Sequence, residues 1–577
     1  MRSLDRALVR AALCALALAA CAAPAHAAWP VDGRALCTAS GDQNYPVMAP
    51  DGTGGAIAVW EDRRGTASDV YAMRVGPNGV LGSGWPADGR ALCTAAQDQV
   101  APVIASDGVG GAYIAWEDYR AGGSNPDIYV QRVNAGGAIA AGWPASGVDV
   151  CTLTSVQGHP SIVRDGAGGA IVVWEDFRSG LGDIYAQRVN TAGIAQWTVS
   201  GIPICAAAGD QRFPVAVTDG AGGAIIVWED DRNGAGNGDV FAQRVSISGV
   251  VQWATNGVPV TTAAGDQIEL HAASDGAGGV LVEWEDHRSD NSDVYAQRIG
   301  ADGAAKWTAD GLAICTDLAE QYGGSIAADG AGGAFVAWID LRAGLSDIYA
   351  QHATPAGAIA AGWPANGLAI CTADGNQFDP AVASDAAGGA FIAWNDQRTG
   401  AAATDVYALR VSGAGTLPAG WSANGAVYCG AAGDQYLNSI MADGTGGAII
   451  AWSDQRGTSA DIYAQRIAGA GGVPTVDVPG LPALPPVALA AAPNPMRVAT
   501  RLAFSLDAES RVDARITDVS GRTVRVLLDG VALAPGPHTL DWDGRDAAGA
   551  RLPAGVYLAV VRAGAAPARV EKLALIP

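Results

Sequence analysis

The sequence predicts an all-β protein: an eight-bladed β-propeller closed by its N-terminal strand, followed by a small C-terminal β-sandwich. One Trp-centred run recurs eight times along most of the chain. The composition, with 78 Gly, 17 Trp and only 16% charged residues, is typical of tight turns and aromatic-packed strands. The two ends of the repeat region are complementary pieces of one unit. A chain of 577 residues exceeds what a single core organises, so a repeat architecture or several domains are expected.

The repeated run is seen clearly at residues 165–178, which begin with Asp165 and end with Arg178. In every copy the Trp follows the Asp by nine residues, and the Arg follows the Trp by four. Self-similarity at such a period is the signature of solenoids, propellers and arrays. The eight tryptophans are Trp60, Trp116, Trp174, Trp228, Trp284, Trp338, Trp394 and Trp452.

Each repeat is long enough for four strands, which the second repeat illustrates. We expect a short first strand at 102–106, a Gly-rich turn, the Trp strand at 112–118, a third strand at 127–133 and a fourth between 143 and 151. Only two segments vary in length between repeats, and both change by two residues. A step of two preserves the face on which each side chain lies, so these segments are predicted to be hairpins.

The ends of the repeat region favour a closed ring over an open array. The run from Trp29 to Cys37 reads as a fourth strand without the first three, and the eighth repeat stops after its third strand at Arg466. The first segment therefore supplies the strand that the last blade lacks, which removes exposed sheet edges. An open solenoid would carry atypical caps instead.

Outside the repeats, the chain begins with the features of an export signal. Residues 1–27 have a basic start, an apolar run and a small-x-small site ending at Ala27, and no other apolar run approaches a transmembrane length. An alternative is a lipobox-like segment that would lipidate Cys21. We expect the propeller at 28–466, a Gly/Pro/Ala-rich linker at 467–490 and a second domain at 491–577. The protein is predicted to be extracellular or on the outer cell surface.

The C-terminal domain shows short alternating strands that indicate a β-sandwich. It contains Asp-Val-Ser-Gly-Arg at 518–522, Trp-Asp-Gly-Arg-Asp at 542–546 and Pro-Ala-Gly-Val-Tyr at 553–557. In these motifs it resembles the FlgD-type immunoglobulin-like domain and the similar C-terminal sorting domains of type IX-secreted proteins. The resemblance implies sorting or surface retention and no catalysis. The propeller repeats resemble secreted bacterial propellers only loosely.

The composition also limits the partners and the chemistry. A net charge of −23 argues against nucleic acid, which is bound through basic surface. No cofactor or metal is expected, because no Walker loop or spaced Cys/His cluster occurs, and the histidines occupy non-equivalent positions. The seven cysteines after Cys21 are expected to be small buried strand residues, and the protein is expected to be a monomer.

The Asp and Arg that follow each Trp are predicted to form a structural clamp. A residue demanded in every blade is demanded by the blade, and bidentate Arg–carboxylate pairing explains why the base is never Lys. The expected clamp residues are Asp62, Arg64, Asp118, Arg120, Asp176, Arg178, Asp230, Arg232, Asp286, Arg288, Asp340, Arg342, Asp396, Arg398, Asp454 and Arg456.

Function is expected where the repeats differ or where one face sums many weak groups. The Gln-bearing loops between blades should share a face with the Glu-Asp-x-Arg hairpins, and we expect a glycan or protein ligand on this face or in the central funnel, bound without catalysis. A polysaccharide hydrolase or lyase with its site on the same face is the alternative. The candidate binding residues are Glu61, Glu117, Glu175, Glu229, Glu285, Asp42, Asp210, Asp266 and Asp434.

Overall fold

The computed structural model describes residues 29–234, 236–400, 403–469, 489–492, 496, 499–506, 510–518, 522–534, 536–547, 549–563 and 569–576. These residues form 39 β-strands and no helix. The chain divides into two compact units, residues 1–477 and 478–577. The predicted signal and lipidation sites, Ala27 and Cys21, lie outside the described residues.

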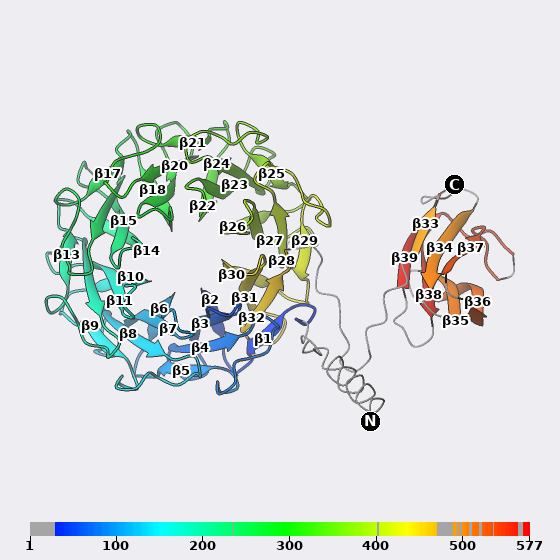
Figure 1. The fold of residues 1–577 in the computed structure, drawn as a ribbon, viewed down its shortest axis with the longest axis horizontal. Coiled ribbons are helices and arrows are strands. Elements are labelled where there is room, and N and C mark those ends of the chain that lie inside the picture. Colours follow the sequence, from blue (N-terminus) through cyan, green and yellow to red (C-terminus); the bar gives the residue numbers. More distant parts are fainter. Residues whose placement is uncertain are drawn as a thin grey trace, which may run out of the picture. The chain divides into compact units, whose positions relative to one another are not determined.

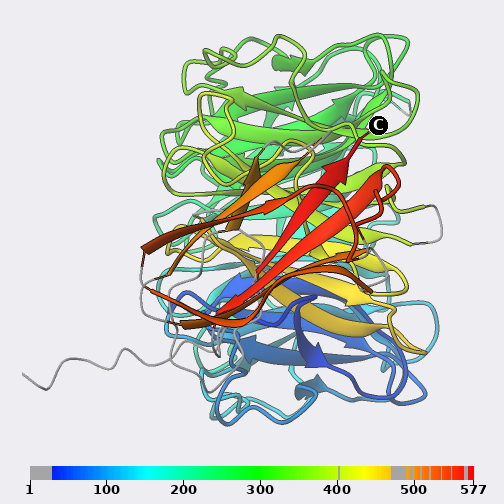
Figure 2. The same cartoon turned by 90° about the vertical axis from the view of Figure 1, so that its right-hand side faces the viewer.

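The first unit is a ring of eight four-stranded antiparallel sheets (Figure 1). Blade one is β2-β3-β4-β5, and the following blades repeat this order up to β26-β27-β28-β29 in blade seven. The eighth sheet has the order β1-β32-β31-β30, so the N-terminal strand completes the last blade. The predicted fold class, including its closure, is confirmed. Figure 2 shows the strands of the ring from the side.

The innermost strand of each blade begins at the repeated Gln and is eight residues long. These strands surround the centre of the ring (Figure 1). In the second repeat this strand begins at Gln99, three residues before the predicted start at residue 102. The eight innermost strands are β2 (Gln43–Pro50), β6 (Gln99–Ser106), β10 (Gln157–Arg164), β14 (Gln211–Thr218), β18 (Gln267–Ser274), β22 (Gln321–Ala328), β26 (Gln377–Ser384) and β30 (Gln435–Ala442).

The second strand carries the Trp and is buried on both faces, which explains its continuous apolar character. All eight of its tryptophans are fully buried between neighbouring blades. The second strands are β3 (Ala56–Asp62), β7 (Ala112–Asp118), β11 (Ala170–Asp176), β15 (Ala224–Asp230), β19 (Val280–Asp286), β23 (Ala334–Asp340), β27 (Ala390–Asp396) and β31 (Ala448–Asp454).

The third and fourth strands complete each blade, and the fourth is only four residues long. The third strands are β4 (Asp69–Val75), β8 (Asp127–Val133), β12 (Asp183–Val189), β16 (Asp239–Val245), β20 (Asp293–Ile299), β24 (Asp347–Ala353), β28 (Asp405–Val411) and β32 (Asp461–Ile467). The fourth strands are β5 (Arg90–Cys93), β9 (Val148–Cys151), β13 (Ile202–Cys205), β17 (Val258–Thr261), β21 (Leu312–Cys315), β25 (Leu368–Cys371), β29 (Ala426–Cys429) and β1 (Arg34–Cys37).

The second unit contains two sheets, in the orders β33-β34-β37 and β36-β35-β38-β39. Its core includes Met496, Trp542 and Tyr557. β33 begins inside the predicted linker. The strands are β33 (Leu489–Ala492), β34 (Thr500–Leu506), β35 (Ser510–Asp518), β36 (Thr523–Leu533), β37 (Gly536–Trp542), β38 (Gly555–Ala563) and β39 (Arg569–Leu575).

Candidate functional site: the inner strands and their loops

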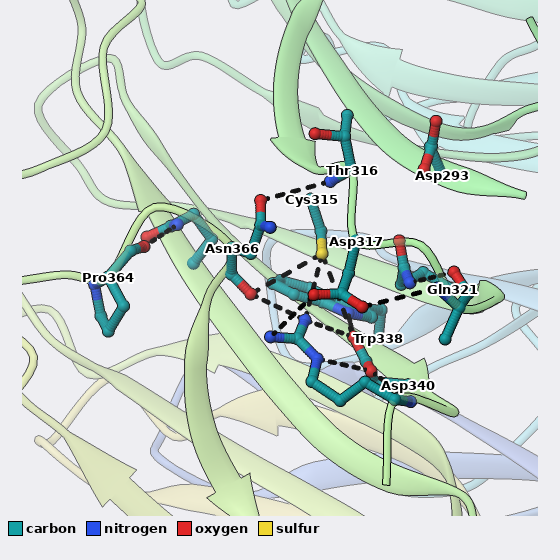
Figure 3. A network of polar contacts seen from close by, with 12 residues as sticks. Asp293, Cys315, Thr316, Asp317, Gln321, Trp338, Asp340, Pro364 and Asn366 are labelled. Atoms are coloured by element: carbon teal, nitrogen blue, oxygen red, sulfur yellow. Dashed lines mark hydrogen bonds and ion pairs between the residues drawn. The ribbon is translucent and has the colours of Figure 1, made fainter. Parts of the chain in front are cut away.

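The Asp–Arg pairs that follow the tryptophans are buried joints between blades, as blade six illustrates (Figure 3). The indole Nε1 of Trp338 donates a 3.0 Å hydrogen bond to Oδ2 of Asp340. Arg342 donates from Nε to Oδ1 at 2.7 Å and from Nη2 to Oδ2 at 2.6 Å. Its Nη2 also reaches the carbonyl oxygen of Asn366 at 2.9 Å. The Asp340 side chain is fully buried, so Arg342 and Trp338 supply the hydrogen bonds that water would otherwise provide.

The preceding blade contributes a cysteine to the same cluster. Nη2 of Arg342 lies 3.2 Å from Sγ of Cys315, which ends β21 in blade five, and its guanidinium lies 4.0 Å from the centre of the Tyr349 ring. Burial raises the pKa of the Cys315 thiol to about 12. The seven cysteines of the described chain are all buried and free, so their observed place is packing between blades. All eight predicted Asp–Arg pairs have Nη2–Oδ2 distances of 2.5 or 2.6 Å.

A second Asp–Arg pair, which the sequence did not reveal, lies at the opposite end of each blade. Asp51 of the Gly-rich turn accepts the N–H of Gly55 at 2.9 Å and the Nε–H of Arg74 at 2.8 Å. The turn carboxylate is therefore fully used within the blade. In blade six the basic partner is His352, whose Nε2 lies 3.1 Å from Asp329.

The Glu that follows the Trp links its blade to the next one. In four of the five cases the carboxylate accepts a backbone N–H two residues after the next Gln. The bonds are Glu61 with Ala101 (2.9 Å), Glu117 with His159 (2.8 Å), Glu229 with Glu269 (2.7 Å) and Glu285 with Gly323 (2.8 Å). Ser453 closes this series by accepting the N–H of Tyr45 across the ring seam at 3.2 Å.

Glu175 is the exception among the five. Its Oε2 lies 2.9 Å from Nδ1 of His159 in its own blade. Burial raises the pKa of Glu61, Glu229 and Glu285, in the case of Glu229 to about 7. These glutamates already have hydrogen-bond partners within the propeller. Their role in binding a ligand stays a prediction.

The predicted aspartates of the Gln-bearing loops also accept backbone N–H groups, here from the hairpin of the blade that the loop leaves. The bonds are Asp42 with Ala460 (3.0 Å), Asp210 with Gly182 (2.8 Å), Asp266 with Gly238 (2.9 Å) and Asp434 with Thr404 (2.9 Å). Glu229, Asp210 and Asp266 line one cavity of about 220 Å³ between blades four and five. Asp42 lines another of about 290 Å³ at the seam.

The residue two positions after each Gln is the feature that sequence reasoning missed. In seven blades the pairing of the first and second strands skips this residue and the next one, which defines a β-bulge. In blade eight Leu437 itself pairs with Trp452, and the register shifts directly after it. Six of the eight are non-glycine residues with φ between 49° and 56°, a region that is uncommon for such residues. We call these eight positions the bulge residues: Tyr45, Ala101, His159, Phe213, Glu269, Gly323, Asp379 and Leu437.

Most of the bulge residues are solvent-exposed on the innermost strands, and each is a different amino acid. Tyr45 is 63% exposed and Phe213 is 44% exposed. The imidazole of His159 meets the ring of Phe213 edge-on at 4.7 Å between centres. A signal for the bulge was present in the sequence: a Pro follows the bulge residue in five blades, and Pro within a sheet is largely confined to edges and bulges.

The described residues contain no cluster of three or more His, Cys, Asp or Glu side chains arranged to hold a metal ion. Among them there is also no helix with the length and apolar character needed to cross a membrane.

Comparison with solved structures finds, among others, three proteins of 9–15% sequence identity. PorZ, a surface component of the type-IX secretion system of Porphyromonas gingivalis, is 13% identical over 90% of this chain, with a TM-score of 0.33. The chain spans 64% of PorZ. The polysaccharide lyase Uly1 is 9% identical over 67% of this chain and 92% of its own, with a TM-score of 0.39. An endo-arabinase from Bacteroides thetaiotaomicron is 15% identical over 47% and 95%, with a TM-score of 0.28.

Comparison with curated proteins finds no match. Comparison with family models finds one for the second unit: residues 497–566 match the FlgD Ig-like domain. The predicted resemblance of the C-terminal region to the FlgD-type immunoglobulin-like domain is thereby confirmed.

Proposed function

We propose that this protein is an exported, non-enzymatic binding module whose propeller holds a neutral glycan on its bulge residues. One observation carries the proposal: the bulge residues differ in all eight blades and six of them are exposed, while the Gln, Trp, Asp and Arg around them do not change. A repeat that keeps its framework and varies one exposed position presents a composite surface for a ligand.

The chemistry of the bulge residues favours sugars. Tyr45 and Phe213 offer exposed aromatic rings, which can pack against the apolar faces of a pyranose or furanose. The carboxylates of Glu269 and Asp379 can accept hydrogen bonds from hydroxyl groups. The net charge of −23 disfavours anionic polysaccharides and nucleic acid.

The hydrogen bonds of the predicted carboxylates to backbone N–H groups disfavour the hydrolase or lyase alternative. Of the predicted carboxylates, Glu61 and Glu117 accept backbone N–H groups of the next blade, and Asp42 and Asp210 accept those of a neighbouring hairpin. A general acid or base needs a carboxyl group that can reach the substrate, and these are engaged in joints that recur around the ring.

Export and retention complete the proposal. The segment 1–27 directs secretion, and the FlgD-like domain serves sorting or surface anchoring, so the propeller is displayed outside the cell. The protein acts as a monomer, and its propeller, not its FlgD-like domain, carries the glycan-binding surface.

The experiment is a paired assay of binding and turnover. The purified chain is applied to an array of neutral oligosaccharides, and the same sugars are incubated with it and checked for release of shorter products. We expect binding without release, and Phe213→Ala should weaken binding by about 10-fold. Val109→Ala, an exposed apolar residue of a Gly-rich turn, is the matched control. Released sugar, or binding to protein ligands and no glycan, would overturn the proposal.

A further inference from the structure

Blade five departs from the repeat at two residues that face each other across its first two strands. His271 on β18 and Glu283 on β19 are register partners. The equivalent pairs elsewhere consist of small or apolar residues, such as Val215 with Val227 in blade four. The residues equivalent to Glu283 are Val59, Ala115, Val173, Val227, Ala337, Ala393 and Ala451.

The two side chains form a hydrogen-bonded pair. Nδ1 of His271 lies 2.8 Å from Oε1 of Glu283. The Glu283 side chain is only 1% exposed, whereas that of His271 is 49% exposed on the innermost strand. Nε2 of His271 has no hydrogen-bond partner among the residues that the structure describes. The pair thus leaves one imidazole nitrogen without a partner on a half-exposed side chain and keeps its carboxylate buried.

The neighbouring blade is shaped around the buried carboxylate. Gly324 of blade six stands where five blades have Pro, and a Cβ atom built there would lie 2.3 Å from Oε2 of Glu283. Any larger residue would push the carboxylate out of its place. Three departures from the repeat, at 271, 283 and 324, are therefore sterically and chemically coupled.

The fold itself does not require this pair. Taking a carboxylate out of water is costly, and replacing a buried charged pair by apolar residues is often neutral or stabilising. The other seven blades of the ring have small or apolar residues at the positions of His271 and Glu283. A costly pair that the framework can do without points to a ligand.

We propose that His271, held by Glu283 in the space left by Gly324, is a subsite that donates a hydrogen bond to a sugar hydroxyl or ring oxygen. This assignment rests on the proposed function and names its polar anchor. Glu269, the bulge residue of the same blade, supplies an acceptor two residues away on β18. A donor beside an acceptor matches the hydroxyl groups of a neutral saccharide.

The protonation of His271 supports the role of donor. Burial lowers the pKa of the imidazole, but the hydrogen bond with Glu283 and the charges of Glu283, Glu269 and Glu285 outweigh it, so the pKa lies above its ordinary value of 6.5. Burial also raises the pKa of Glu283. Because the protonated ring carries a hydrogen on Nε2, binding should weaken as the pH rises through the pKa of His271.

The test replaces the unusual residues of blade five by those typical of the repeat. His271→Val with Glu283→Val gives blade five the residues that blade four already has, and Gly324→Ala displaces the carboxylate while keeping both partners. Binding to an array of neutral gluco-, xylo- and manno-oligosaccharides is measured across a pH series, together with Tm.

We expect the double variant to keep or raise Tm, to bind about 10-fold more weakly and to lose the pH dependence. Gly324→Ala should show the same loss of affinity. If wild-type protein binds and the double variant binds equally well, or if its Tm falls sharply, the pair is structural and the inference fails while the proposed function stands. If the wild-type protein binds none of these sugars, both fail.

Discussion

Arg456 in the eighth blade donates a 2.7 Å hydrogen bond to the carbonyl oxygen of Asp32, 424 residues earlier in the chain. Beside it, Nε2 of Gln465 reaches the carbonyl oxygen of Pro30 at 2.6 Å, and β1 pairs with β32. The bond from the clamp arginine to a carbonyl oxygen recurs in every other blade, so the ring is held shut by a contact that also joins strands within each blade.

Deletion of residues 29–37 should destabilise the propeller and leave β32 as an exposed edge. Leu36 and Cys37 are each 1% exposed, so their loss alone should lower the free energy of unfolding by about 2 kcal/mol or more. Open edges pair with other chains, so we also expect dimers or aggregates. Thermal denaturation and light scattering measure both effects. The control is Asp88→Ala, because Asp88 holds in blade one the position that Asp32 holds in the deleted segment. If the deletion variant stayed monomeric with an unchanged Tm, the closure of the ring would be contradicted.

Replacement of a clamp arginine by lysine should cost far more than the same change at the surface. Arg178→Lys replaces a two-point grip on the buried Asp176 by a single ammonium group, and we expect a loss of about 1 to 3 kcal/mol. Arg212→Lys alters an ion pair whose Arg is 43% exposed and should change stability by less than about 0.5 kcal/mol. Chemical denaturation compares them, and equal effects would refute the structural interpretation of the clamp.

The buried cysteines should resist thiol reagents while the protein is folded. Burial raises the pKa of Cys205 and Cys371 to about 12, and the thiolate is the reactive form. Mass spectrometry after iodoacetamide treatment at neutral pH should show labelling of these residues only when denaturant is present. Because Thr261 fills the same slot in blade four, Cys205→Thr should retain the fold. Rapid labelling of the native protein would contradict their burial.

Asp385, one of the turn aspartates, should make part of the stability depend on acid pH. Burial raises the pKa of Asp385, but the N–H groups of Gly389 and Ala387 and the guanidinium of Arg410 outweigh it, leaving the pKa below its ordinary value of 3.8. A lowered folded pKa stabilises the protein above the unfolded pKa, and this contribution disappears as the pH falls through the folded pKa.

We therefore expect Asp385→Asn to be destabilising at neutral pH, with a difference from wild type that shrinks at pH values below about 4. Urea denaturation at several pH values measures it. Asp290→Asn, at an exposed hairpin position, is the matched control variant. A difference for Asp385→Asn that grows on acidification would have the wrong sign.

The sequence alone determined the number of blades, the order of their strands and the closure of the ring. Fixed spacings from Asp to Trp to Arg defined one unit, and steps of two residues marked the hairpins, because strand side chains alternate with a period of two. The complementary ends around Trp29 and Arg466 predicted the closure, because pairing the single N-terminal strand with the incomplete last sheet removes two exposed edges.

Only the tertiary structure decided what the polar side chains do. Glu61 and Asp42 each accept an N–H group from a neighbouring blade, a relation that spacing within one repeat cannot express, while their role in binding a ligand stays a prediction. The bulge changes no segment length between blades, so the comparison of spacings did not reveal it, and only the recurring Pro beside it could have done so. The pairing of His271 with Glu283, and the space that Gly324 leaves for it, depend on contacts across strands and between blades.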